Sequence, residues 1–98
     1  MSLLNLLKES QLDILRNGID KKDSELIKLL KSRIDIAIEI AKFKKENGIT
    51  VVQPNRWDEV LDNLKKYCSR VGLDYDLVIP VWDAIHKLSI KTQQQITH

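Results

Sequence analysis

The sequence has few of the residues that interrupt or cross-link a chain. Its 98 residues include one cysteine, two prolines and three glycines. A single cysteine excludes an internal disulfide, and so few prolines and glycines leave long stretches with nothing to break a helix. Aromatic residues make up only 5% of the chain, against 43% apolar residues overall. Leucine, isoleucine and valine must therefore supply most of the core.

An excess of one charge and long apolar runs are also lacking. Sixteen basic and 14 acidic residues give a net charge of +2, spread without the basic stripe that follows a phosphate backbone. Lys8, Glu9 and Asp13 interrupt the stretch that would have to be apolar in a secretory signal. No run approaches the length of a membrane span. We therefore expect a soluble, cytoplasmic protein that binds neither nucleic acid nor membranes.

The length of the chain fits one domain, residues 1–98, but with a thin core. A chain of this size folding alone buries only roughly 60–65% of its unfolded surface. Apolar helix faces are often completed by a second copy of the same chain, so we expect a homo-oligomer.

Apolar residues recur at helical spacing through most of the chain, which predicts an all-α protein with three helices. The first helix should run from about Ser10 to Asn47 and end at Gly48, while the pattern leaves open whether residues 2–9 join it. Residues 49–53 are expected to form an extended loop. A second helix should begin with Pro54 in its first turn and end at Gly72. A third should begin near residue 74 or 76, with Pro80 inside it removing a backbone bond or bending the entry.

Polar residues occupy inward positions of this pattern. Steps of three and four along the long helix pass through Arg16, Ile19, Asp23, Leu26, Leu30, Arg33, Ala37, Ile40 and Lys44. In the third helix, Ser89 and Gln93 share one face. One interpretation is that the long side chains reach water, or that Arg33 pairs with a carboxylate such as Asp23 to set the register. The other is that cations and hydrogen-bond donors line a pocket for an anionic small molecule.

Helix geometry limits which cations can share a ligand. Arg33 and Lys44 are eleven residues apart, which places them within about 20° on one face and about 16 Å apart along the axis. Arg16 lies seventeen residues before Arg33, about 25 Å away and about 100° round the helix. If Arg16 serves the same small ligand, it must come from another subunit.

Four stretches carry a resemblance to the all-helical chorismate mutase family, the AroQ class. They cover most of the region from Gln11 to Ile96 and read "LRNGIDKKDSELIKLLKSR" (15–33), "IAKFK" (40–44), "QPNRW" (53–57) and "SIKTQ" (89–93). The resemblance implies an intertwined homodimer of three-helix chains with antiparallel long helices. It also implies two active sites, each completed by an arginine from the opposite subunit.

The same resemblance assigns roles to individual residues. It implies that Arg33 and the opposite subunit's Arg16 bind the two substrate carboxylates, and that Lys44 and Gln93 donate to the ether oxygen of the breaking bond. Ser89 would support a carboxylate and Arg56 would lie at the edge of the site. The implied reaction is the Claisen rearrangement of chorismate to prephenate, a step toward phenylalanine and tyrosine. It needs no nucleophile, metal or cofactor.

Two positions depart from the best-known members of the family. Gln53 and Trp57 stand where those members carry acidic residues that contact the substrate hydroxyl. The chain is similar here to a branch that reads Gln-x-x-Arg-aromatic, and in that branch Gln53 is expected to donate to the hydroxyl. Some members of this branch are fused to a synthase of the first shikimate step, so a synthase of that pathway is a candidate partner.

Two alternative functions fit the same pattern. Isochorismate pyruvate lyase, a salicylate-forming relative on the same fold, also uses paired arginines, a lysine and a glutamine, although Ser89 with Gln93 fits the mutases better. A non-catalytic helical dimerisation or regulatory module would also carry polar residues in a heptad, because such residues set register and partner choice. Neither histidine stands in a cysteine or acidic cluster at metal-ligand spacing, so no metal site is expected.

Overall fold

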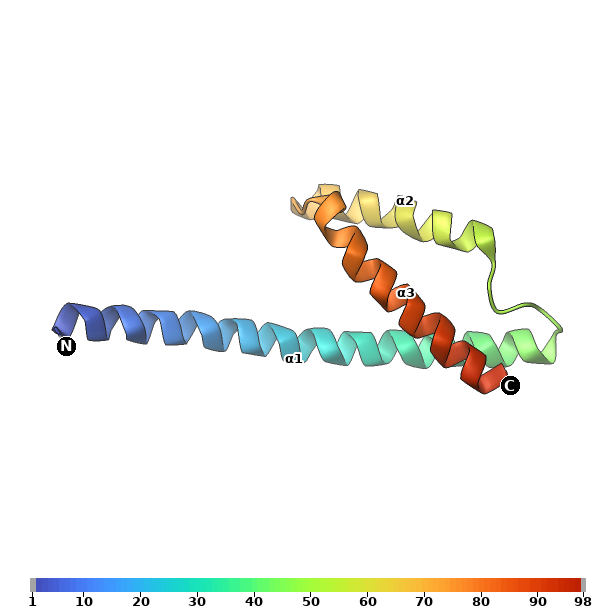
Figure 1. Ribbon diagram of the computed structural model, residues 1–98, viewed down its shortest axis with the longest axis horizontal. Coiled ribbons are helices and arrows are strands. Elements are labelled where there is room, and N and C mark those ends of the chain that lie inside the picture. The colour runs from blue at the N-terminus through green and yellow to red at the C-terminus, as the bar shows by residue number, and fades with distance from the viewer. Residues whose placement is uncertain (1, 98) are drawn as a thin grey trace. The chain divides into compact units, whose positions relative to one another are not determined.

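The computed structural model describes residues 2–97, and over that range the protein consists of three α-helices (Figure 1). They are α1 (Leu3–Glu46), α2 (Pro54–Val71) and α3 (Tyr75–Thr97). This confirms the all-α, three-helix prediction. The chain divides into two compact units, one up to Arg33 and one from Ile34 onward.

The first unit is helical from Leu3, which settles the question that the sequence pattern left open. The Ser2 hydroxyl accepts a hydrogen bond from the backbone N–H of Asn5 at 3.2 Å, and its carbonyl accepts one from Leu6 at 3.1 Å. A serine in this position satisfies a donor that the first helical turn leaves unpaired. Most apolar residues of this unit, among them Leu15 and Leu26, are exposed within the single chain. An isolated helix gains little stability from its own sequence, so packing against these faces would supply most of its stability.

The end of α1 is set by Gly48. Its φ of +65° belongs to the left-handed region, which glycine enters without a steric penalty. The backbone N–H of Ile49 then reaches back to the Lys44 carbonyl at 2.8 Å, closing the helix end. The helix ends at Glu46, one residue before the predicted end, and Asn47 lies in the turn that follows. Residues 49–53 are irregular and connect to α2, in agreement with the predicted loop.

Helix α2 begins and ends where the sequence signals predicted, and α3 begins within one residue of its predicted start. Pro54 opens α2, where a missing N–H costs nothing, and Gly72 closes it with φ +75°. The Asp74 carboxylate accepts a bond from the backbone N–H of Asp76 at 3.0 Å and so caps the start of α3. Pro80 lies inside α3, which continues to Thr97 in spite of the backbone donor that proline lacks.

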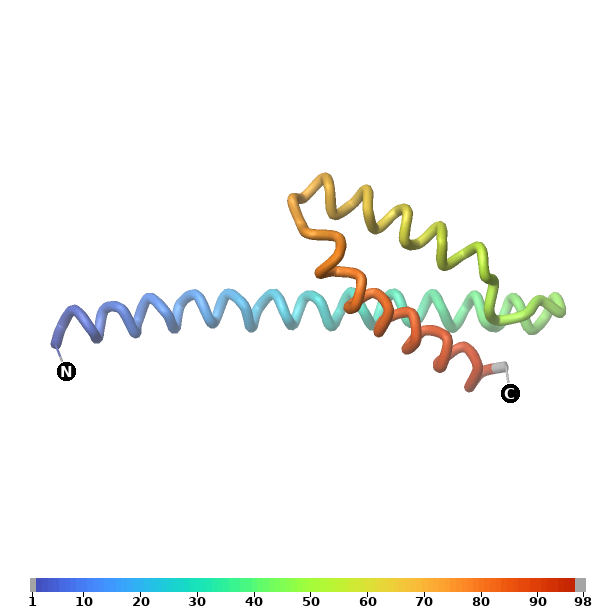
Figure 2. Tube along the Cα trace, turned by 45° about the horizontal axis from the view of Figure 1, so that its top comes forward, coloured from blue at the N-terminus to red at the C-terminus, as the bar shows by residue number. Residues whose placement is uncertain are grey.

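The second unit holds the buried residues. Within it, α3 runs back from the end of α2 toward the C-terminal part of α1 (Figure 2). Ala37 and Ala41 of α1 are buried, as are Leu64 and Cys68 of α2. The small core is consistent with a protein whose apolar faces are only partly covered by its own chain.

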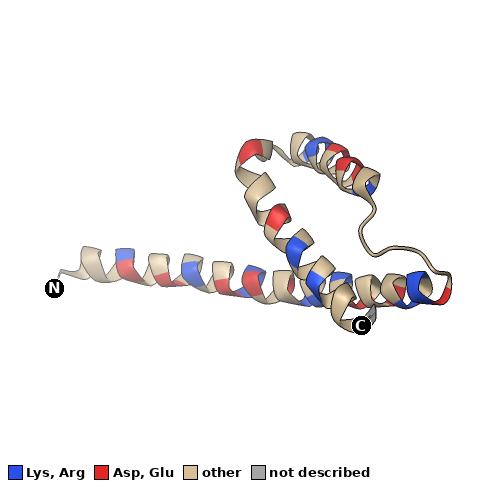
Figure 3. Cartoon of the chain, turned by 45° about the vertical axis from the view of Figure 1, so that its right-hand side comes forward, with Lys and Arg blue, Asp and Glu red and all other residues tan. Residues whose placement is uncertain are grey.

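Charged residues of both signs alternate along the helices (Figure 3). Exposed pairs such as Lys22–Glu25 at 3.2 Å and Lys87–Asp83 at 2.8 Å join successive turns. The hydrogen bond and the charge of Asp83 raise the pKa of Lys87. Over residues 2–97, no helix combines the length and the apolar character needed to cross a membrane.

Candidate active site

The inner face of α3 carries two polar side chains. Ser89 and Gln93 lie four residues apart and are only 7% and 6% exposed. The amide nitrogen of Gln93 donates to the backbone carbonyl of Ala37 on α1 at 3.0 Å. Burying an amide is unfavourable unless it is hydrogen-bonded, so this contact holds the Gln93 side chain in a fixed orientation. Polar groups are thereby placed inside the second unit, as the spacing predicted.

Lys44, on the last turn of α1, is held by the loop that follows it. Its Nζ atom donates to the Val51 carbonyl at 2.6 Å, and its side chain is half-buried. An ammonium has three N–H donors, so one bond to the loop leaves donors for an anionic ligand. The same bond ties residues 49–53 to the lysine.

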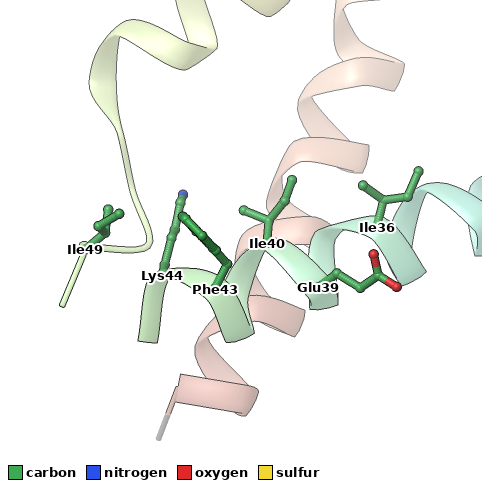
Figure 4. Close-up of a pocket in the computed structure, with 6 residues that line it drawn as sticks. All are labelled: Ile36, Glu39, Ile40, Phe43, Lys44 and Ile49. Atoms are coloured by element: carbon green, nitrogen blue, oxygen red, sulfur yellow. The ribbon is translucent and has the colours of Figure 1, made fainter. Parts of the chain in front are cut away.

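A pocket of about 290 Å³ lies beside this lysine. Figure 4 shows Ile36, Ile40, Phe43 and Lys44 pointing to the same side of α1, with Ile49 across from Lys44. The full lining consists of Ile36, Glu39, Ile40, Phe43, Lys44 and Ile49. Apolar walls with a cation at one end suit a compact organic anion.

Gln53 belongs to the loop between α1 and α2. Its amide nitrogen donates to the Thr50 carbonyl at 3.1 Å and to the Thr50 hydroxyl at 3.0 Å. The Thr50 hydroxyl in turn donates to the Val52 carbonyl at 3.3 Å. Thr50 therefore engages the nitrogen end of the amide. The oxygen, which is an acceptor, is the end of Gln53 suited to meet a ligand in this conformation.

The three predicted arginines belong to two different units of the chain. Arg56 forms an exposed pair with Glu59 at 3.1 Å, and Arg16 forms one with Asp13 at 4.0 Å. Exposed pairs of this kind contribute at most about 1 kcal/mol, so either guanidinium can exchange its partner for a ligand at little cost. Arg33 is half-buried at the end of the first unit. The second unit thus contains Lys44, Gln53, Arg56, Ser89 and Gln93, while Arg16 and Arg33 belong to the first.

Two features of the site have no signal in the sequence. One is the Val51 carbonyl, since a backbone acceptor does not depend on residue type. The other is the stack of Trp57 on His86, whose ring centroids are 4.2 Å apart at an interplanar angle of 25°. His86 lies one turn before Ser89 on α3, so the stack joins α2 to α3 next to the buried polar pair.

Comparison with known proteins identifies relatives of this chain. Residues 15–94 match the family model of type II chorismate mutases. A 4-amino-4-deoxychorismate mutase of Streptomyces venezuelae is 30% identical over 80 residues, covering 82% of this chain and 78% of that protein. A chorismate mutase of Methanocaldococcus jannaschii is 26% identical over 81 residues, 83% of this chain and 82% of the relative. The T-protein of Haemophilus influenzae is 27% identical over 95 residues, 97% of this chain but 24% of the relative. No solved structure matches significantly.

Proposed function

This chain belongs to the type II chorismate mutase family, whose model matches residues 15–94, and we propose that it converts chorismate into prephenate. The observation that carries the proposal is the pairing of that match with the arrangement of the second unit. A lysine borders an apolar pocket, and a buried glutamine is fixed on the facing helix.

The chemistry requires positioning and charge stabilisation. In the rearrangement the ether C–O bond breaks as a new C–C bond forms within one molecule, so no group or electron leaves the substrate. This is why the proposal includes no cofactor or metal. Catalysis then consists of holding the compact conformer and stabilising the negative charge that develops on the ether oxygen. Lys44 and Gln93 are proposed as the donors to that oxygen, with Ser89 supporting a carboxylate.

Each of the two substrate carboxylates needs a cation, and among the proposed site residues of the second unit Lys44 is assigned to the ether oxygen. Arg33 is proposed to bind one and Arg16 of a second copy the other, with Arg56 at the edge of the site. The exposed apolar residues of the first unit support a homodimer, because a second copy would cover them. The proposed active domain is residues 1–98 completed by its copy, acting in the cytoplasm. A shikimate-pathway synthase as a further partner rests on resemblance alone.

A second candidate substrate is 4-amino-4-deoxychorismate, which carries an amino group where chorismate has a hydroxyl. It is supported by the name of the Streptomyces venezuelae relative, and the conformation of Gln53 is compatible with either substrate. Thr50 engages the amide nitrogen of Gln53, so the amide oxygen is the end that would accept a hydrogen bond from a substrate. An acceptor fits a hydroxyl or an ammonium group, since both donate.

The test is to incubate the pure protein with each substrate and identify the products by NMR. We expect chorismate to give prephenate with the largest kcat/KM. Preference for 4-amino-4-deoxychorismate would assign the second candidate, and salicylate plus pyruvate from isochorismate would assign the lyase. If no substrate is consumed and a bicyclic dicarboxylate shaped like the transition state does not bind, the chain is a non-catalytic helical module.

A further inference from the structure

Residues 50–53, between α1 and α2, are joined by side-chain hydrogen bonds. The Thr50 hydroxyl donates to the Val52 carbonyl at 3.3 Å. The amide nitrogen of Gln53 donates to the Thr50 carbonyl at 3.1 Å and to the Thr50 hydroxyl at 3.0 Å. One threonine therefore supplies two acceptors to the glutamine amide, and the hydroxyl among them is itself bonded to a backbone carbonyl.

The amide of Gln53 has two ends of similar shape and opposite hydrogen-bonding character. Its nitrogen carries two donors, and its oxygen only accepts. A carbonyl oxygen cannot donate, so the end that contacts the Thr50 carbonyl must be the nitrogen. The Thr50 hydroxyl has one proton, which is donated to Val52, so it too can only accept from Gln53. Both contacts favour the same orientation of the amide, in which the oxygen is the end left for a ligand.

The side chain of Gln53 is not used to begin α2. Gln53 is the N-cap residue, with φ −115° and ψ 105°, but its side chain forms no capping hydrogen bond. Its backbone carbonyl accepts from the backbone N–H of Arg56 at 3.0 Å, a bond that does not depend on the side chain. The amide can therefore be replaced without removing a contact that starts the helix.

The 50–53 segment is attached to the lysine of the proposed site. The Lys44 Nζ atom donates to the Val51 carbonyl at 2.6 Å. Ile49, at the start of the same loop, lines the pocket beside Lys44 (Figure 4). In chorismate the ring hydroxyl is on the carbon next to the one that carries the ether. A group that binds the hydroxyl must therefore lie near the group that contacts the ether oxygen, and the loop carries Gln53 on the segment that Lys44 holds.

From these contacts we infer that Thr50 is a positioning residue, which holds Gln53 as an acceptor and so selects substrates with a hydrogen-bond donor on that ring carbon. The inference rests on the proposed function, because it assigns the ring hydroxyl of chorismate to Gln53. A hydroxyl or an ammonium group donates to the amide oxygen. A hydrogen atom, a keto group or an ether at the same carbon cannot, and substrates that carry one are disfavoured.

A purely structural role for Thr50 has a different consequence. If Thr50 only stiffened the loop, its loss would weaken the binding of every ligand to the same degree. If it orients Gln53, its loss weakens only the binding of ligands that donate to Gln53. The ratio of affinities for two ligands that differ by one hydroxyl group therefore separates the two roles.

The probes are two bicyclic dicarboxylates shaped like the transition state, one with the ring hydroxyl and one with hydrogen in its place. Isothermal titration calorimetry gives a Kd for each, and the ratio of the two is the hydroxyl preference. The wild type should prefer the hydroxyl form about fivefold, the effect of one net hydrogen bond. Thr50→Val keeps the branched shape but lacks the hydroxyl, and should lower the preference to about twofold. The backbone carbonyl of residue 50 still accepts from Gln53, so the preference falls without vanishing.

Three further variants complete the test. Thr50→Ser keeps the hydroxyl and should keep the preference of the wild type. Thr92→Val is the matched control, because the Thr92 hydroxyl also donates to a backbone carbonyl, that of Leu88 at 2.9 Å, and it should change neither Kd. Gln53→Ala should abolish the preference. Adding Thr50→Val to Gln53→Ala should lower it no further, since Thr50 acts through Gln53.

The outcomes separate the inference from the proposed function. A reduced preference in Thr50→Val, with Thr50→Ser and Thr92→Val like the wild type, supports the inference. Equal weakening of both probes, the same loss in Thr50→Ser, or no preference in the wild type overturns it. If Thr50→Val keeps the full preference in a protein that converts chorismate, the inference fails and the proposed function stands. A wild type that binds neither probe and consumes no chorismate removes both.

Discussion

Arg33 is the residue that most clearly separates a binding site from a plain helix interface. It follows the inward spacing of the apolar residues of α1, and it is half-buried. In the proposed function its guanidinium binds a substrate carboxylate, a pairing that is strong because both groups are charged.

We predict that Arg33→Ala lowers kcat/KM for chorismate by two to three orders of magnitude. This corresponds to roughly 3–4 kcal/mol of lost transition-state stabilisation. Steady-state kinetics on protein whose helicity is checked by circular dichroism measures the effect. Arg70→Ala, the same change at an exposed position of α2, should keep normal activity. Near-normal kinetics in folded Arg33→Ala would remove this arginine from the site.

Gln93 permits a test through pH. Gln93→Glu keeps the length of the side chain, but the ionised carboxylate cannot donate a hydrogen bond to the ether oxygen. A protonated carboxyl can donate, and burial raises the pKa of a carboxyl. Activity of this variant should therefore be low at neutral pH and should rise as the pH falls through that raised pKa.

The measurement is kcat/KM from about pH 5 to 8, where a buried carboxyl of this kind titrates. The wild type and Gln95→Glu, which adds the same charge at an exposed position of α3, should lack the rise at acid pH. If all three proteins give parallel profiles, Gln93 does not donate to the reacting atom.

At the residue level, the sequence correctly predicted that Ser89 and Gln93 would be inward, but it did not predict their contacts, and Arg16 and Asp23 of the same pattern are exposed within the single chain. The burial of Ser89 and Gln93 followed from their spacing. The Ala37 carbonyl that orients Gln93 and the Val51 carbonyl that holds Lys44 did not. Backbone acceptors are set by how the elements pack, and residue type does not reveal them.

At the scale of elements, the helix boundaries were largely predictable because they rest on local chemistry. Pro54, Gly48 and Gly72 each act within one turn, so their signals can be read without tertiary structure. The beginning of α1 was not predictable in the same way. It depends on Ser2 as a cap and on leucines that lack a partner within the chain.

Gly72 gives a stability prediction for this scale. Its φ of +75° costs a residue with a Cβ about 1–2 kcal/mol, and no heavy atom lies within 4 Å of an added Cβ. Gly72→Ala should therefore lower the free energy of unfolding by about 1 kcal/mol, through the backbone rather than through a clash. Gly72→Asn should lose less, because asparagine tolerates this region better. Urea unfolding at equal protein concentration measures both, and equal stability of Gly72→Ala and the wild type would contradict the capping role.

At the scale of the whole molecule, the single chain leaves much apolar surface uncovered. The first unit exposes Leu15, Ile19 and Leu26, and the second exposes Ile36 and Phe43. The sequence predicted a second copy from the short length of the chain and from the distance between Arg16 and Arg33. Both arguments predict that the partner is a second copy of the chain. Neither predicts which residues of the two copies touch.

The central proposal, a chorismate mutase site shared between two copies, is tested most directly by mixing two inactive variants. Arg16→Ala and Arg33→Ala chains, unfolded together and reassembled, should form hybrids in half of the dimers. Each hybrid has one site with both arginines and one with neither, so about a quarter of wild-type activity should return. Each variant reassembled alone is the control and should stay inactive. Recovery of about a quarter supports the shared site, and no recovery in a mixture that demonstrably contains hybrids would contradict it.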